Sequence, residues 1–487
     1  MNLSKSKYCR GITCSRMLWL DTYMPEKGID INNASVLENG SSVGELAKEL
    51  FGKYIDIPFD EDLTKMIITT KKEIESNEKR IITEASFSYD NNFCSVDLLK
   101  KDGDTYEIYE VKSSTKTKDI YIHDVSYQYY VLSKLNMKVK KAAIVHINPF
   151  YERKGSLDIN KLFVIEDVTE KVINIVSSID TNIKSLKNIL ANNNEPIIDI
   201  GKHCNSPYEC PYFNYCTEKF SKPNIFDLKR LRFSSKISNY QKGIITLDSV
   251  KSEIKDEKVL TEVEYIFKKT DKINKLAIDE FLNTLSYPLY YLDFETFQEA
   301  VPSLDRQKPY EQVPFQYSLH YKMSENSSLE HKEFLAYPGH DPRRELAERL
   351  CEDIDLNVCT VAYNMNFEKS VIRRLADLYP DLRNHLMNIH DNMKDLMVPF
   401  YHMDYYNNKM QGSYSIKYVL PALFPSDPSL DYHNLDEVHN GSEAMNAYFE
   451  MSKLEGAELE KLRNNLLKYC ELDTYAMVKI LEKLQEL

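Results

Sequence analysis

Two acidic residues interrupt a strongly apolar and aromatic stretch late in the chain, and they constrain the fold more than any other feature. Asp293 and Glu295 lie two residues apart within residues 287–297, so on a β-strand both carboxylates face the same side. Far downstream, Tyr469 and Asp473 are four residues apart in a helical pattern and would share one helix face. Acids gathered from distant segments are costly to bury unless a cation neutralises them. The sequence therefore predicts a strand packed beside a C-terminal helix, with a divalent-metal site between them.

Length and composition are those of a soluble globular protein. The chain has 487 residues, enough for two or three domains, with 43% hydrophobic and 28% charged residues. No apolar run approaches the length of a membrane span, and residues 1–20 contain no continuous apolar segment, so we expect a cytoplasmic protein without a membrane partner. In that reducing compartment the nine cysteines are better candidates for metal or cluster ligands than for disulfides.

A basic stretch lies between the two halves of the chain, although the formal net charge is −13. Binding of nucleic acid depends on local charge, and a metal-binding site itself collects carboxylates. Lys229, Arg230 and Arg232 are therefore candidate contacts for a phosphate backbone, and a solvated helix face is the alternative interpretation.

The pattern of elements predicts an α/β protein in three parts: residues 1–220, a helical linker over 221–285, and residues 286–487. In the first part we expect strands at 81–89, 92–100, 106–113 and 142–147, and helices at 38–52, 124–135 and 168–190. In the last part we expect strands at 289–297, 314–322, 330–335 and 358–363, and helices at 342–354 and 366–378.

A second acidic constellation lies in the first part. Asp97 is on one predicted strand, and Glu110 and Lys112 point to the same face of the next, so a hairpin brings the three together. Two acids can hold Mg²⁺ or Mn²⁺, while a lysine near the metal orients the attacking water. Ordinary salt bridges across neighbouring strands are the alternative.

The cysteines of the first part suggest a ligand set. Cys204, Cys210 and Cys216 form a compact trio, and Cys14 is a distant fourth thiol, with Cys9 as its competitor. Three clustered cysteines and one distant partner suit an iron–sulfur cluster or zinc. The other four are expected to be buried, inert thiols: Cys94, Cys351, Cys359 and Cys470.

These features together resemble the RecB-like PD-(D/E)XK nucleases of the iron–sulfur type, seen in AddB and in CRISPR-associated RecB-like exonucleases. The matching residues are Cys14, Asp97, Glu110, Lys112, Gln128, Cys204, Cys210 and Cys216. The resemblance implies a restriction-endonuclease-like domain with a [4Fe-4S] cluster, a catalytic lysine and a catalytic glutamine. The early helix departs from the family because it has no histidine, which leaves Glu45, Glu49 or Glu84 to complete the site.

The last part resembles DnaQ-type (DEDD) 3′–5′ exonucleases of the tyrosine subclass. Asn364 and Glu368 match the second motif of these enzymes, with Glu in place of Asp, and Ser415-Ile416-Lys417 resembles the segment that precedes the last motif. The resemblance implies an RNase H-like fold in which Asp293, Glu295, Glu368 and Asp473 bind two metal ions and Tyr469 orients water. Asn364 and Lys417 are further candidate contacts for nucleic acid.

The full arrangement resembles the bacterial family catalogued as domain of unknown function 2779. We therefore expect a nuclease that hydrolyses DNA, preferentially single-stranded and from an end, in repair, end-processing or phage defence. RNA remains open as a substrate. The alternatives are a catalytically inactive scaffold that binds nucleic acid and a ribonuclease with a single working site.

Overall fold

The structure, a computed structural model, describes residues 3–30, 34–75 and 80–487, with only the backbone over 34–38. The chain has the expected mixed α/β character and divides into two compact units. The first comprises Met1–Phe220 with Glu299–Tyr310, and the second comprises Ser221–Gln298 with Glu311–Leu487. The segment expected to be a separate helical linker thus packs with the second unit.

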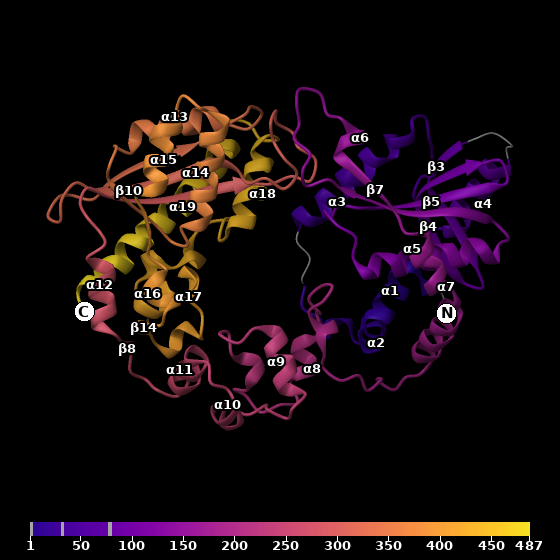
Figure 1. Ribbon diagram of the computed structural model, residues 1–487, viewed down its shortest axis with the longest axis horizontal. Helices are drawn as coiled ribbons and strands as arrows, with labels where there is room; N and C mark the ends of the chain where they lie inside the picture. Colours follow the sequence, from indigo (N-terminus) through magenta and orange to yellow (C-terminus); the bar gives the residue numbers. More distant parts are fainter. Residues whose placement is uncertain (1–2, 31–33, 76–79) are drawn as a thin grey trace. The chain divides into compact units, whose positions relative to one another are not determined.

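A mixed sheet forms the centre of the first unit, in the order β2-β3-β4-β5-β6-β7, with the short β1 parallel to β4 (Figure 1). Strands β3, β4 and β5 form an antiparallel meander, and β6 returns parallel to β5 after the crossover helix α5. The strands are β1 (Leu3–Ser4), β2 (Ile55–Asp56), β3 (Arg80–Tyr89), β4 (Asn92–Asp102), β5 (Thr105–Lys112), β6 (Lys138–Ile147) and β7 (Phe163–Asp167). The helices are α1 (Lys5–Thr13), α2 (Ser15–Tyr23), α3 (Ala34–Ala47), α4 (Leu63–Glu75), α5 (Asp119–Lys134), α6 (Ile159–Leu162), α7 (Thr169–Ala191) and α8 (Phe213–Thr217).

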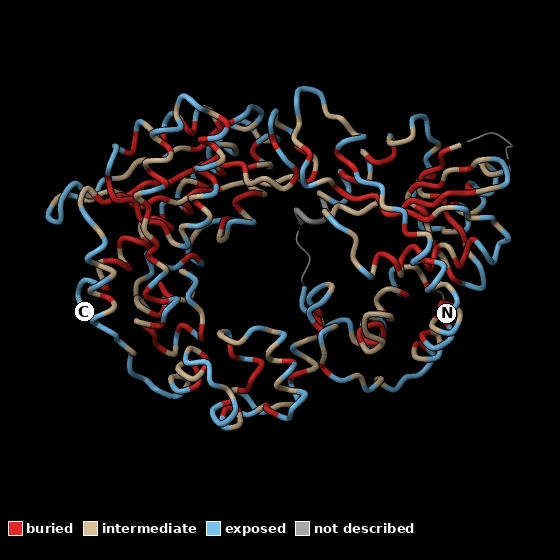
Figure 2. The backbone as a smooth tube through the Cα atoms, viewed as in Figure 1, coloured by how far each residue is buried: buried red, intermediate tan, exposed pale blue. Residues whose placement is uncertain are grey.

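Side chains that alternate along the strands of this sheet pack into two separate hydrophobic cores, one on each face. Ile108 on β5 packs with residues of α5 and α7 on one face, whereas its neighbour Tyr109 packs with residues of α3 on the other. Buried residues accordingly follow the strands of the sheet (Figure 2). Glu110 and Lys112 lie two and four residues after Ile108 on the same strand, so their side chains lie on the same face of the sheet as Ile108 and face α5.

The second unit contains a five-stranded sheet in the order β11-β10-β9-β12-β13. Strands β9, β10 and β11 are antiparallel, and β12 and β13 run parallel to β9. The strands are β9 (Leu289–Phe297), β10 (Val313–Lys322), β11 (Glu330–Leu335), β12 (Cys359–Ala362) and β13 (Met393–Asp395). The predicted strands 289–297 and 330–335 agree with β9 and β11 at both ends.

Helices cover both faces of this sheet (Figure 1). Tyr290, Leu292 and Phe294 share a core with α13 (Arg343–Asp353), α14 (Asn366–Leu378) and α15 (Arg383–Asp391). The alternate residues of β9, including Asp293 and Glu295, therefore face the long helix α19 (Gly456–Gln485).

The remaining elements of the second unit are short. They are α9 (Phe233–Tyr240), α10 (Leu247–Glu253), α11 (Glu257–Tyr265), β8 (Lys272–Ile273), α12 (Lys275–Leu282), α16 (Val398–Tyr401), β14 (Tyr405–Tyr406), α17 (Ile416–Leu423) and α18 (Gly441–Met451). Within the described ranges, every helix is too short or too polar to cross a lipid bilayer. All nine cysteines are free thiols.

Candidate active sites

The second unit brings four predicted metal ligands together from three elements. Asp293 and Glu295 come from β9, Glu368 from the first turn of α14, and Asp473 from the middle of α19. Asp293, Glu295 and the thiol of Cys470 each offer a ligand atom, and these three atoms lie within 4.8 Å of one another. Cys470 was expected to be inert, but its Sγ lies 3.8 Å from the Asp293 carboxylate.

The pKa values of all four carboxyls in this acid cluster are raised, because burial, with the charges of neighbouring acids at Asp293, Glu295 and Glu368, outweighs the nearby positive charge. Burial raises the pKa of Asp293 well above its usual range, and the charges of Asp473 and Glu295 add to that effect. Burial also raises the pKa of Glu368 to about 8 and that of Asp473 to about 6. Lys417 lowers the pKa of Glu295 without overcoming burial and the charge of Asp473.

The donor set of the cluster fits a divalent metal ion. Glu368 is 2% exposed, and its Oε2 is buried without a hydrogen-bond partner among the described residues. A buried carboxylate oxygen that lacks a partner is costly. Carboxylate oxygens are the ligands that Mg²⁺ and Mn²⁺ prefer, so such a cation would satisfy the oxygen and offset the excess negative charge.

Two tyrosines adjoin Asp473. Tyr432 donates a hydrogen bond to Asp473 Oδ1 at 2.5 Å, and the Tyr469 hydroxyl also hydrogen-bonds that carboxylate. Tyr432 was not predicted, because it begins a short 3-10 helix (Tyr432–Asn434) that carries no recognisable motif. A cavity of about 690 Å³ beside it is lined by Tyr432, Lys417, Phe424 and His439, among other residues.

A tight turn between β12 and α14 positions Glu368. Asn364 adopts a left-handed conformation, with φ of 70°, and its backbone N–H donates to Asp395 Oδ1 at 2.9 Å. The same oxygen accepts from the backbone N–H of Met397 at 3.0 Å. Asp395 therefore fixes the turn that starts α14, while Asn364 itself is exposed.

The first unit brings together the predicted Asp97, Glu110, Lys112 and Gln128. Asp97 accepts the backbone N–H of Val111 at 2.7 Å, next to the last paired position of β4 and β5. Glu110 is 2% exposed, and its two oxygens accept from Lys112 Nζ and Gln128 Nε2, both at 2.6 Å. Burial raises the pKa of Glu110 to about 7, with further contributions from the charges of Asp124 and Asp97.

Two residues of this site were missed from the sequence. Lys5 Nζ lies 2.9 Å from both oxygens of Glu110, 3.6 Å from Asp97 and 3.8 Å from Asp124. Asp124 also pairs with Lys112 at 2.9 Å. Its position four residues before Gln128 on α5 was a usable signal, whereas nothing around Lys5 indicated its role. The Lys5 ammonium is therefore a positive charge, supplied by the protein itself, that lies among the carboxylates of Asp97, Glu110 and Asp124.

Among the three acids left open by the sequence, Glu84 lies at the first site. It stands on β3 between the paired positions Thr83↔Leu98 and Ala85↔Val96, which places it across from Asp97. Its φ of 56° is left-handed, and burial together with the charge of Asp97 raises its pKa to about 7. Glu45 is instead mostly exposed and pairs with Lys48, and Glu49 is exposed.

The four predicted cluster ligands line one small cavity: Cys14, Cys204, Cys210 and Cys216. Burial, together with the charges of the other thiols of the group, raises the pKa values of Cys204 and Cys216 to about 11. Cys9 lines a second cavity, beside Lys112 and Asp124, which shares Cys210 with the first.

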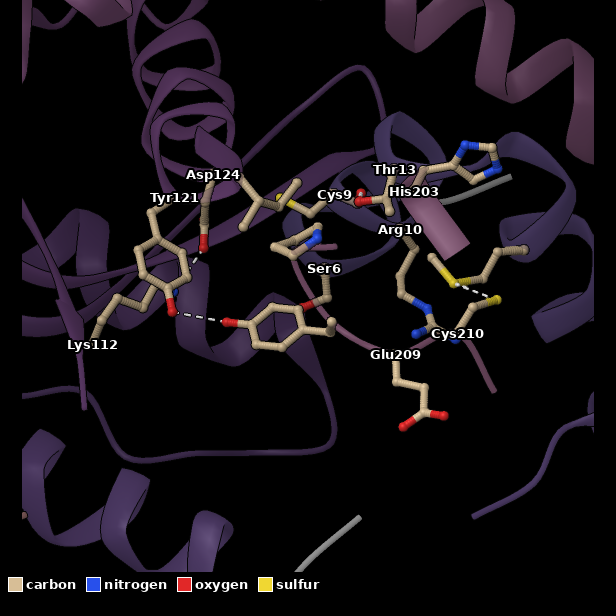
Figure 3. Close-up of a pocket in the computed structure, with 14 residues that line it drawn as sticks. Ser6, Cys9, Arg10, Thr13, Lys112, Tyr121, Asp124, His203, Glu209 and Cys210 are labelled. Carbon is tan, nitrogen blue, oxygen red and sulfur yellow. Dashed lines mark hydrogen bonds and ion pairs between the residues drawn. The ribbon is translucent and has the colours of Figure 1, made fainter. Parts of the chain in front are cut away.

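That second cavity, of about 270 Å³, lies between the acids and the cysteines (Figure 3). Lys112, Tyr121 and Asp124 lie at one end, and Arg10 and Cys210 lie at the other. The hydroxyl of Tyr121 is 2.8 Å from that of Tyr208, a residue that also lines the cavity.

The predicted basic stretch is partly engaged within the second unit. Arg230 donates from both terminal nitrogens to the carbonyl oxygens of Phe400 and Tyr401, at 2.9 and 3.0 Å, while its Nε is buried without a hydrogen-bond partner among the described residues. Lys229 Nζ lies 3.5 Å from the ring centroid of Tyr418. Arg232 and Lys417 are exposed.

Comparison with known proteins identifies a family match for part of the chain. Residues 290–415 match the model of a family described as domain of unknown function (DUF2779). That segment includes Asp293, Glu295 and Glu368 and ends before Tyr469 and Asp473. A curated relative, the uncharacterized protein MG366 of Mycoplasma genitalium, is 23% identical over 412 residues. The alignment covers 74% of this chain, and the chain spans 61% of the relative's length.

Proposed function

We propose that this protein is a metal-dependent nuclease that hydrolyses phosphodiester bonds of single-stranded DNA. The observation that carries the proposal is the buried cluster of Asp293, Glu295, Glu368 and Asp473, in which burial and the charge of Asp473 raise the pKa values of the other three carboxyls. Such a group is unfavourable as a purely structural element and is suited to binding divalent cations.

In the second unit these four acids would hold Mg²⁺ or Mn²⁺. The bound metal would supply electrostatic stabilisation to the attacking and leaving oxygens of the phosphodiester. Burial raises the pKa of Tyr469 far above its usual range, so the phenol keeps its proton and donates it to Asp473, and its oxygen can accept a hydrogen bond from the attacking water. The contact with Asp473 orients that hydroxyl, and the exposed Lys417 can attract the phosphate backbone.

In the first unit Asp97 and Glu110, with Glu84 beside them, would hold a divalent cation. Lys112 keeps its charge because the carboxylates of Glu110 and Asp124 outweigh the effect of burial on its pKa. It can therefore orient water or stabilise negative charge on a phosphate. Gln128 holds Glu110 in place through its amide.

The four cysteines would hold a metal cofactor, a [4Fe-4S] cluster or zinc, because they line one small cavity together.

A single strand is the substrate form that the cavity of the first unit suits best. Tyr121 and Tyr208 line it, and Tyr208 is 54% exposed, so its ring is accessible for stacking on an unpaired base. Bases held in a duplex would not present their faces to these rings.

Cleavage of end-labelled oligonucleotides tests the proposal. Full-length protein is incubated with 5′- and 3′-labelled single strands in Mg²⁺ or Mn²⁺, alongside Asp97→Ala, Asp293→Ala and the double variant. We expect wild-type protein to shorten the strands and the double variant to lose at least about 100-fold in rate. Equal cleavage by wild-type protein and the double variant would refute the proposal.

A second candidate is a nuclease with one working site, in the second unit. It is favoured by Lys5, whose ammonium contacts both oxygens of Glu110 and can replace a metal ion there. In that case Asp97→Ala leaves cleavage unchanged, while Asp293→Ala alone abolishes it. The same assay with RNA strands identifies the preferred nucleic acid.

A further inference from the structure

Two histidines and a glutamate meet on the α19 side of the sheet in the second unit, outside the acid cluster. His320 on β10 and His331 on β11 are direct cross-strand partners, and their ring centroids are 4.4 Å apart. Glu471 comes from α19. One ligand atom from each of the three residues lies within 4.8 Å of the other two.

A chain of hydrogen bonds through two hydroxyl groups links one nitrogen of the His331 ring to one nitrogen of the His320 ring. His331 Nε2 is 2.9 Å from Ser318 Oγ, which is 2.6 Å from Thr474 Oγ1, which is 2.8 Å from His320 Nδ1. His331 Nδ1 and His320 Nε2 take no part in this chain. Hydrogen bonds of this kind commonly orient metal-binding histidines and fix which nitrogen faces the ion.

The surrounding charges suit a cation. Glu333 lies two residues after His331 on β11 and interacts electrostatically with both His331 and Glu471. It is therefore a candidate fourth ligand.

We propose that His320, His331 and Glu471 bind a transition-metal cation of the Zn²⁺ class. Two imidazoles and a carboxylate favour Zn²⁺ or Ni²⁺ over Mg²⁺, whereas the all-carboxylate cluster next to it favours Mg²⁺ or Mn²⁺. The ion would join β10 and β11 to α19, the helix that carries Tyr469 and Asp473. It would thus stabilise the position of this helix on the sheet.

Zinc stoichiometry in matched variants tests the proposal. Full-length protein is treated with chelator and titrated with Zn²⁺ against a chromophoric competitor, for wild type, His331→Gln, Glu471→Gln and the control His402→Gln. His402 is an exposed histidine of the same unit. The cysteine cavity and the acid cluster are unchanged in every variant, so their zinc binding cancels in the comparison.

We expect wild type and His402→Gln to bind one more zinc equivalent than His331→Gln. Glu471 is exposed, so its replacement does not disturb packing, and we expect Glu471→Gln to raise the Kd of that equivalent about 10- to 100-fold. Ser318→Ala, which keeps all ligands, should raise this Kd by a similar factor. Far-UV circular dichroism identifies any variant that fails to fold.

Equal zinc stoichiometry in wild type and folded His331→Gln would overturn the proposal, as would an unchanged Kd in Glu471→Gln. Displacement of the extra zinc by a thousandfold excess of Mg²⁺ would overturn the assignment to the Zn²⁺ class. The measurement involves no cleavage, so its outcome is independent of the proposed nuclease activity.

Discussion

Replacing Glu368 by glutamine should stabilise the protein when divalent metal is withheld. The Glu368 side chain is buried, and burial together with the charges of Asp395 and Asp473 raises its pKa from 4.5 to about 8. The metal-free protein therefore has to bury a charge or bind a proton at this position. Glutamine keeps the shape of the side chain and has no charge to bury.

The magnitude and sign follow from proton linkage. Between pH 4.5 and about 8 the folded state holds more protons on Glu368 than the unfolded state, so the free energy of unfolding falls as the pH rises through this window. At about 1.36 kcal/mol for each unit of pKa, this carboxyl costs on the order of 3 kcal/mol at pH 7. For a chain of 487 residues, with an unfolding entropy of about 2.1 cal/mol/K for each residue, that corresponds to roughly 3 °C in Tm.

Thermal unfolding in chelator at pH 5, 6, 7 and 8 provides the assay. We expect the Tm of Glu368→Gln to exceed that of wild type increasingly from pH 5 to pH 8. Glu460→Gln, which changes an exposed glutamate on α19, serves as the control and should follow wild type at every pH. Addition of Mg²⁺ at pH 8 should raise the Tm of wild type more than that of Glu368→Gln. Equal pH dependence in wild type and Glu368→Gln would refute the reasoning.

Three further predictions concern the other groups of the two units. Lys5→Met removes a competing ammonium and should tighten Mn²⁺ binding at the first site about 10-fold or more, measured by electron paramagnetic resonance; weaker binding would contradict the competition. Tyr469→Phe should lower kcat for single strands about 10- to 100-fold with little change in KM, and an unchanged kcat would remove Tyr469 from the mechanism. Anaerobically purified Cys14→Ser should lose the broad absorption near about 400 nm that Cys9→Ser keeps, and loss in both variants would contradict the ligand assignment.

The sequence predicted the elements that carry periodic patterns. Strand β9 and helix α14 begin and end where the pattern placed them, because alternation on a strand and the spacing of apolar residues on a helix are local properties. The convergence of Asp293 and Asp473 agrees with the prediction from local spacing, because Asp293 and Glu295 share one face of β9 while Tyr469 and Asp473 share one face of α19.

Long-range contacts without a local pattern were not predictable. Lys5 reaches Glu110 across 105 residues, and Tyr432 reaches Asp473 across 41, and neither stands in a recognisable motif. The pairing of His320 with His331 depends on the register between β10 and β11, which a sequence pattern does not specify. The contacts of Arg230 with the carbonyl oxygens of Phe400 and Tyr401 are likewise long-range, and composition does not reveal them.

The central claim is that divalent cations held by these carboxylates contact the phosphate being cleaved. A single strand with one phosphorothioate at its terminal linkage tests this most directly, because Mg²⁺ binds sulfur poorly and Mn²⁺ accepts it better. We predict that wild-type protein cleaves this linkage at least about 100-fold more slowly than the normal one in Mg²⁺, and that Mn²⁺ restores much of the rate. Cleavage that continues at full rate in chelator would contradict the claim.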